Sequence, residues 1–316
     1  MRCRAARVGE RTRAWHHDGV RALLLLGSIA LVACRPGAEA RASAGADASA
    51  EAKADADASA RADASANENE NENATGRAGV GAVADVDVAT AWCIEGMKGL
   101  DEDCCYVAPP GATRLLVYLH GIVPPVKDSV QKQTVEGAVM KAAMRAGVAA
   151  IVPRGRRGIG PAGAHDWWAW PTSPGTHAQM VAEIVARWSV LKKKLEDAQG
   201  RKFERTYLAG SSNGAYFLSA IALRGDAEEL GFPIDGYGSM SGGAPGGRGA
   251  NALQGRTPRA VYVGYGSYDA ETKPGALALG AVFESAHWPV RVAEHPFGHG
   301  AREVYLDEAF AFWATQ

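Results

Sequence analysis

The sequence predicts an α/β domain in which a mostly parallel sheet is covered by helices on both faces. After residue 110, short apolar runs typical of buried strands alternate with stretches of helical periodicity. Strands that alternate with helices favour parallel pairing, because each crossover helix packs back onto the sheet. The strand candidates are the segments 114–119, 148–152, 206–209, 234–240, 260–263 and 290–293.

The clearest helix candidate lies between the second and third strand candidates. Thr176 with Gln179 three residues later fits a capping box, so we expect the helix to begin there. Its apolar residues fall on one face of a helix, and they are Met180, Val181, Ile184, Val185, Trp188, Leu191 and Leu195.

The first 33 residues have the pattern of a secretory signal peptide. An Arg-rich start leads into an apolar run over 22–33, which is too short to span a bilayer as a helix. The run ends in Leu31-Val32-Ala33-Cys34, which resembles a bacterial lipobox. We therefore expect lipidation of Cys34; an ordinary secretory signal cleaved near Ala33 is the alternative.

Residues 34–82 form a low-complexity segment rich in Ala, Asp, Ser, Asn and Glu. Large apolar side chains are almost absent, so the segment cannot bury enough surface to offset the entropy of ordering. We expect a disordered tether over 34–82 that links the lipid anchor to one globular domain over 83–316.

Three cysteines lie close together at the start of the predicted domain: Cys93, Cys104 and Cys105. Export to an oxidising compartment favours one disulfide from Cys93 to Cys104 or Cys105, and both pairings stay open. A zinc site built from four thiolates is disfavoured with three cysteines, and we expect no metal.

The segment Gly210-Ser211-Ser212-Asn213-Gly214 matches the pattern G-x-S-x-G. A strand-like run precedes it and an amphipathic stretch over 215–223 follows it. This strand–turn–helix setting is the one that a nucleophile elbow requires, and a glycine-rich connection without chemistry is the alternative. Ser212 is therefore the predicted nucleophile.

These features make residues 83–316 resemble the α/β-hydrolase superfamily. The segment 205–214 is similar to the elbow of polyhydroxybutyrate-depolymerase and feruloyl-esterase-like enzymes. The glycine that usually follows Ser-Asn-Gly in those enzymes is Ala215 here, which loosens the subfamily assignment. The resemblance implies serine-esterase chemistry that needs no metal or cofactor.

The resemblance also implies two backbone donors for an oxyanion hole. One comes from the loop after the first central strand, here His120-Gly121-Ile122, and the other from the residue after the nucleophile. We expect these donors to be Ile122, with Val123 as the alternative, and Asn213. His120 is then expected to brace the loop rather than act as a base.

The remaining members of a triad must follow the serine in the order acid, then histidine. Asp269 comes shortly after the strand candidate 260–263, with Glu271 as the nearest rival. His299 lies between two glycines after the last strand candidate, and His295 is the rival there. The predicted triad is Ser212, Asp269 and His299.

Two further features concern the substrate. Trp167, Trp168 and Trp170 follow the second central strand, and with His120 they are candidates for a substrate surface. Packing within the loop is an equal alternative for the three rings. The segment 241–259 is too short for a lid domain, so we expect an open site that suits bulky or polymeric substrates.

The sequence therefore predicts an exported serine hydrolase that cleaves carboxylic esters through an acyl-enzyme intermediate. A peptidase of the same fold and a binding module without turnover are the alternatives. The expected partners are an ester substrate and a bacterial membrane, with the domain facing the periplasm or the cell surface. Nucleic acid is excluded as a partner, because the net charge is −1 and no basic stripe is present.

Overall fold

The computed structural model describes residues 92–126 and 129–316. The predicted signal peptide, the lipidation candidate Cys34 and the predicted tether all lie outside these residues. In the part of the chain that is described, no helix is both long enough and apolar enough to cross a membrane.

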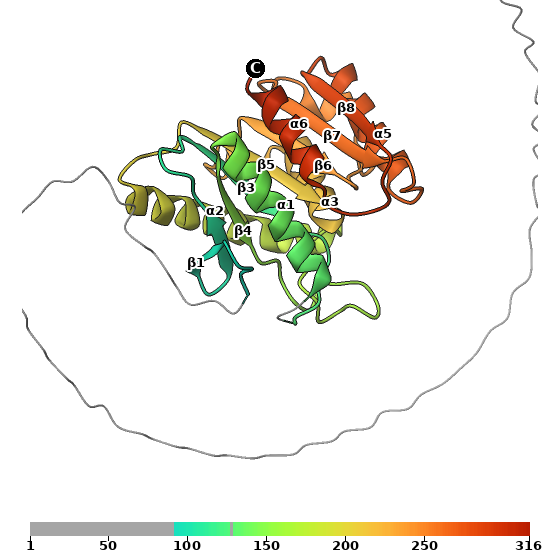
Figure 1. Ribbon diagram of the computed structural model, residues 1–316. Helices are drawn as coiled ribbons and strands as arrows, with labels where there is room; N and C mark the ends of the chain where they lie inside the picture. Colours follow the sequence, from blue (N-terminus) through green and yellow to red (C-terminus); the bar gives the residue numbers. More distant parts are fainter. Residues whose placement is uncertain (1–91, 127–128) are drawn as a thin grey trace, which may run out of the picture. The chain divides into compact units, whose positions relative to one another are not determined.

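One eight-stranded sheet forms the centre of the fold (Figure 1), with the strand order β1-β2-β4-β3-β5-β6-β7-β8. β2 pairs antiparallel with both β1 and β4, and every other pairing is parallel. The carboxyl ends of β3 to β8 therefore meet at one edge. The strands are Lys98–Asp101, Cys104–Val107, Arg114–Leu119, Ala149–Pro153, Arg205–Ser211, Gly236–Met240, Ala260–Gly266 and Val290–His295.

Helices cover both faces of this sheet. α1 and α6 lie side by side on one face (Figure 1), and α2, α3 and α5 pack against the other. Neighbouring residues of β3 contribute to opposite faces, as Leu115 and Leu116 do, so each face has its own apolar core. The helices are α1 Val130–Ala146, α2 Pro174–Gln199, α3 Asn213–Arg224, α4 Asp226–Glu229, α5 Lys273–Ser285 and α6 Glu303–Trp313.

This topology confirms the predicted α/β-hydrolase fold. Between β6 and β7, the segment 241–259 contains one short 3₁₀ helix, Ala250–Leu253, and no lid domain, as expected. The six predicted strands are all present, whereas β1 and β2 were not foreseen, because each has four residues without a clear alternation.

The start of α2 differs from the capping-box prediction. The helix begins at Pro174, and the hydroxyl of Ser173 accepts a hydrogen bond from the Thr176 amide. Ser173 followed by Pro174 is itself a favourable helix start, because proline at the first helical position loses no needed donor. The prediction chose Thr176 as the cap and placed the first turn too late.

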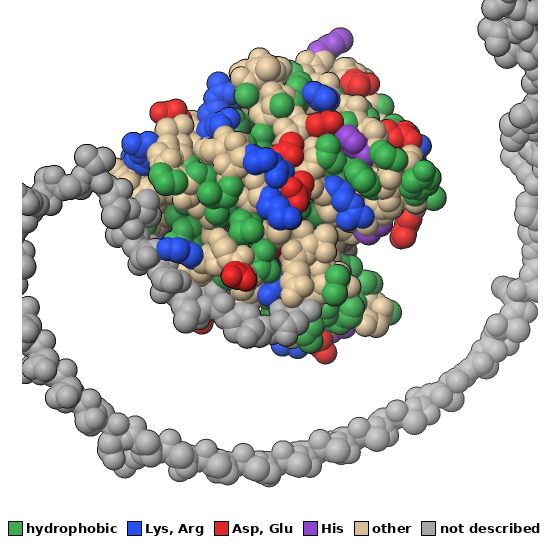
Figure 2. All heavy atoms as spheres, viewed as in Figure 1, with side chains coloured by type: hydrophobic (Ala, Val, Ile, Leu, Met, Phe, Trp, Pro, Cys, Tyr) green, Lys and Arg blue, Asp and Glu red, His purple; other side chains and the backbone are tan. Residues whose placement is uncertain are grey.

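Charged side chains gather over the junction of α1 and α6 (Figure 2). Lys141 and Arg145 of α1 pair with Glu303, and Arg145 also pairs with Asp307. These pairs are exposed, so each contributes little to stability. The carboxylate of Glu303, at the first position of α6, is thus paired with Lys141 and Arg145.

The disulfide prediction is confirmed, and the pairing is Cys93 with Cys105, whose Cα atoms lie 5.5 Å apart. Successive residues of a strand point to opposite faces, so Cys104 and Cys105 of β2 cannot both face Cys93. Cys105 packs in the core beneath α1 and α6, and Cys104 in the opposite core. Cys104 is the one free cysteine among the described residues, and burial raises the pKa of its thiol.

Removal of this disulfide should lower the free energy of unfolding. The bond closes a loop with a sequence separation of 12, for which the chain-entropy model gives about 3 kcal/mol. We expect Cys93→Ala and Cys105→Ala each to cost about that amount in urea unfolding, and the double variant to cost no more than either, since both remove one bond. Cys104→Ala is the control; loss of the disulfide in that variant would contradict the pairing.

Candidate active site

Ser212 sits at the turn between β5 and α3, with φ 53° and ψ −123°. This left-handed φ is unusual for a residue with a side chain, and such strain persists only where the surroundings enforce it. The Ser212 amide is held by the carbonyl oxygens of Met240 and Ser241, each at 3.1 Å. The end of β6 therefore fixes the backbone of the turn.

The glycines of the G-x-S-x-G segment are required by close backbone contact. A Cβ on Gly214 would lie 2.2 Å from the carbonyl oxygen of Leu119, at the end of β3. A Cβ on Gly210 would lie 2.8 Å from the carbonyl carbon of Gly214. Because backbone atoms cannot yield, a side chain at either position would separate α3 from the strands.

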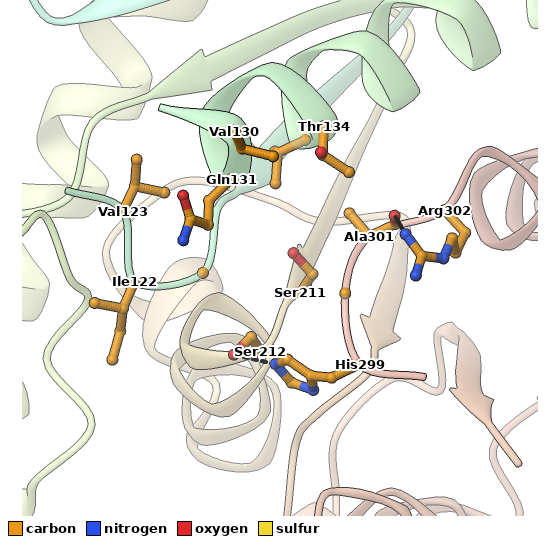
Figure 3. Close-up of a pocket in the computed structure, with 13 residues that line it drawn as sticks. Ile122, Val123, Val130, Gln131, Thr134, Ser211, Ser212, His299, Ala301 and Arg302 are labelled. Atoms are coloured by element: carbon orange, nitrogen blue, oxygen red, sulfur yellow. Dashed lines mark hydrogen bonds between the residues drawn. The ribbon is translucent and has the colours of Figure 1, made fainter. Parts of the chain in front are cut away.

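Ser212, His299 and Asp269 form one hydrogen-bonded chain. The Ser212 hydroxyl lies 2.9 Å from His299 Nε2, a contact drawn in Figure 3, and His299 Nδ1 lies 2.8 Å from Asp269 Oδ2. A carboxylate only accepts, so the proton sits on Nδ1 and Nε2 is free to accept the serine proton. The three side chains come from loops after β5, β8 and β7.

Asp269 is buried and fully engaged at the start of α5. Its Oδ2 accepts hydrogen bonds from the Thr272 hydroxyl at 2.6 Å and from His299, and Oδ1 accepts from the Thr272 amide at 3.3 Å. Burial raises the pKa of the carboxyl, but the bonds from Thr272 and His299 outweigh it and hold the pKa below its ordinary value. Asp269 is thus ionised at neutral pH.

The rival residues lie outside this chain of hydrogen bonds. Glu271 is exposed to solvent. His295 ends β8, where its ring stacks on Phe297 and meets the edge of Tyr305, 3.5 Å from a Glu308 oxygen. Neither side chain is positioned to act on Ser212.

The two amides expected to form the oxyanion hole, those of Ile122 and Asn213, have no acceptor within residues 92–126 and 129–316. The amide of Val123, the alternative to Ile122, donates instead to the Trp168 carbonyl at 3.1 Å. Only Ile122 of this pair is therefore available to a ligand.

His120 is buried and braces the loop that carries Ile122. Its Nε2 accepts a hydrogen bond from the Gly155 amide at 2.9 Å, so Nδ1 carries the proton and donates to the Gly121 carbonyl. Burial lowers the pKa of His120 to about 4, which keeps the ring neutral. Because the peptide unit is planar, fixing the Gly121 carbonyl also fixes the direction of the Ile122 N–H.

Trp170 does not belong to the predicted substrate surface, because its side chain is buried. Trp170 is 2% exposed, and its indole N–H donates to the His120 carbonyl at 2.9 Å. Trp168 packs edge-on against Trp92 and pairs with Val123 through the backbone. Trp167 is partly buried and, like Trp168, Trp170 and His120, does not line the pocket beside Ser212. The alternative of loop packing describes Trp168 and Trp170.

The Asn213 side chain joins this loop to the elbow. Its Oδ1 accepts from the Trp170 amide at 2.6 Å, and its Nδ2 donates to the Trp170 carbonyl at 3.3 Å. The residue after the serine therefore contributes a backbone donor to the site and a side-chain bridge to the loop after β4.

A pocket of about 300 Å³ opens beside Ser212 and His299 (Figure 3). Its walls come from the loop after β3, the first turns of α1 and the loop after β8. The contribution of α1 and of Arg302 was not predicted from the sequence; the position of α1 directly after the Ile122 loop was the available signal. The lining residues are Gly121, Ile122, Val123, Val130, Gln131, Thr134, Val135, Ser211, Ser212, His299, Gly300, Ala301 and Arg302.

No family model matches the sequence, and no curated protein matches it either. Among solved structures, YahD with malic acid is 16% identical, with a TM-score of 0.48 over 67% of this chain and 98% of that chain. Esterase PE8 is 18% identical, with a TM-score of 0.47 over 66% of this chain and 96% of that chain. The Bacillus cereus carboxylesterase is 13% identical, with a TM-score of 0.45 over 70% of this chain and 95% of that chain. These likenesses are too distant to transfer chemistry, which must be inferred from the site.

The neutral state of His120 makes stability depend on pH. In the unfolded chain His120 titrates near 6.5, but in the folded protein near 4. Above about pH 6.5 the neutral ring makes its full contribution to the free energy of unfolding. As the pH falls toward 4, protonation of the unfolded chain lowers that free energy by about 3 kcal/mol. We expect the stability advantage of wild type over His120→Gln in urea unfolding to shrink by about that amount between about pH 7 and about pH 4.

Glu136 has the opposite effect on the pH dependence of stability, because burial raises the pKa of its carboxyl to about 7. Wild type and His120→Gln both contain Glu136, so its effect cancels in the difference between them. The control is His165→Gln, since the His165 side chain is 69% exposed. A constant difference between wild type and His120→Gln at both pH values would contradict a neutral, buried His120.

Proposed function

We propose that this protein is a serine hydrolase that cleaves carboxylic esters through an acyl-enzyme intermediate. The observation that carries the proposal is the continuous chain of hydrogen bonds from Ser212 through His299 to Asp269. A nucleophile in contact with a base, itself oriented by a buried acid, is the arrangement that activates a serine hydroxyl.

In the first half of the reaction, His299 Nε2 takes the proton of the Ser212 hydroxyl as Oγ attacks the ester carbonyl carbon. The carbonyl π electrons move onto oxygen, and the Ile122 and Asn213 amides stabilise that charge. The intermediate then collapses, the bond to the alcohol oxygen breaks, and the alcohol leaves with the proton from His299.

In the second half, water attacks the acyl group on Ser212. His299 takes a proton from the water, the second tetrahedral intermediate collapses, and the proton returns to Oγ as the carboxylic acid leaves. Asp269 stays ionised throughout, holds the proton on Nδ1 and offsets the positive charge that forms on the ring. Its bonds to Thr272 keep the carboxylate in position for this role.

Support for ester cleavage also comes from the pocket next to the nucleophile. Ile122, Val123, Val130 and Val135 give it largely apolar walls, which suit the carbon chain of an acyl or alcohol group. Together with Ser212, the side chains of His299 and Asp269 and the amides of Ile122 and Asn213 are the protein groups that the two half-reactions use.

Matched pairs of variants test the proposal with para-nitrophenyl acetate as substrate. Ser212→Ala should lower kcat by about 10⁶ and Asp269→Asn by about 10⁴, as in comparable triads, and His299→Ala should fall in the same range. Their controls are Ser285→Ala, Glu271→Gln and His295→Ala, which remove like side chains outside the hydrogen-bonded chain.

The controls should keep most of the activity, provided that circular dichroism shows each to be folded. A dead His295→Ala beside an active His299→Ala would mean that the base is assigned wrongly. Folded wild type that hydrolyses peptides but no ester would favour a peptidase, and folded wild type without any turnover would favour a binding module.

A further inference from the structure

Arg302 brings a positive charge to the wall of the pocket that holds Ser212 and His299 (Figure 3). It follows His299 by three residues in the loop after β8 and occupies the position directly before α6, without a capping hydrogen bond from its side chain. Among the described residues that line the pocket, none is an aspartate or glutamate.

The guanidinium of Arg302 has no acidic partner in the part of the chain that the structure describes. Its hydrogen bond runs to the carbonyl of the preceding residue, Ala301, at 3.3 Å. Its flat group also lies over the Phe297 ring, with 5.6 Å between the guanidinium carbon and the ring centroid. These contacts hold the side chain in place but do not neutralise it.

The nearby carboxylates are already engaged elsewhere. Glu303, the next residue, pairs with Lys141 and Arg145 of α1. Asp269 is bound to His299 and Thr272. Arg302 is therefore not one half of a structural ion pair.

Arg302 is partly buried, and the described residues give it no acidic partner, so an anionic group of a ligand in the pocket can pair with it. The planar guanidinium presents donors in a fork that matches the two oxygens of a carboxylate. Gln131 and Thr134, on the opposite wall from α1, add neutral polar groups, and the remaining side chains between are mostly apolar. The pocket thus has an apolar interior with one cationic position.

We infer that the pocket selects esters that carry a free carboxylate, and that Arg302 binds this carboxylate while Ser212 attacks the ester carbonyl. The inference rests on the proposed function and narrows its substrate class to monoanionic esters, such as monoesters of dicarboxylic acids. Arg302 is a specificity residue and takes no part in proton transfer.

Two pairs of probes test the inference, because the carboxylate can lie on either side of the scissile bond. On the alcohol side, para-acetoxybenzoate is compared with para-acetoxybenzamide. On the acyl side, the mono-para-nitrophenyl ester of adipic acid is compared with para-nitrophenyl hexanoate. For each pair, the ratio of kcat/KM for the charged ester to that for the neutral ester is measured on the full chain.

In at least one pair, we expect Arg302→Gln to lower this ratio about tenfold to a hundredfold, the range for losing a hydrogen-bonded charge. Arg302→Lys should restore part of the ratio, since it returns the charge without the planar fork. Arg201→Gln is the control, because Arg201 is exposed after α2 and donates to Gly111 at the opposite edge of the sheet. Its ratio should equal that of wild type.

Labelling of Ser212 by a fluorophosphonate shows that the site is formed in each Arg302 variant. Labelled, active enzymes whose ratios are the same in wild type and Arg302→Gln for both pairs would overturn the inference and leave the proposed function intact. Wild type that neither labels nor hydrolyses any of the esters would overturn both.

Discussion

The close packing of the elbow backbone on the carboxyl end of β3 places the reacting groups of this site. Gly214 touches the carbonyl groups of Leu119 and His120 directly, so the turn that carries Ser212 lies against the loop that carries Ile122. The fit continues at Gly121, where a Cβ would lie 3.1 Å from the Ser212 Cβ. Since the contacts at Gly214 are with backbone atoms, they set the positions of the Ser212 Cα and Cβ without depending on side-chain rotamers.

A second layer of hydrogen bonds holds the three loops of this edge together. His120 links the loop after β3 to the loop after β4 through the Gly155 amide, and the Trp170 indole returns a bond to the His120 carbonyl. Asn213 binds the backbone of Trp170 on both sides. His120 and Trp170, two of the residues that the sequence offered as a substrate surface, thus hold the loops that carry the two amides proposed for the oxyanion. Their ring nitrogens are hydrogen-bonded within the protein, so the proposed function places the substrate in the pocket beside α1 and Arg302.

The sequence predicted what local patterns and chain order determine. The G-x-S-x-G turn, the alternation of strands and helices, and the positions of Asp269 and His299 after late strands all follow from short segments and from the rule that parallel strands end at one edge. The orientation of individual side chains depends on sheet register and on loops distant in sequence. For that reason Cys104 and Cys105 could not be told apart, Trp170 and His120 were placed in the pocket wrongly, and Arg302 was not noticed.

The central claim is that the strained turn presents Ser212, and no other serine, to His299. It is tested most directly by reacting the full chain with a fluorophosphonate and locating the adduct by peptide mass spectrometry. The account predicts one adduct, on Ser212, and its complete loss in Ser212→Ala, while neighbouring Ser211, 2% exposed in β5, stays unmodified. An adduct on Ser211, or equal labelling of wild type and Ser212→Ala, would contradict the account.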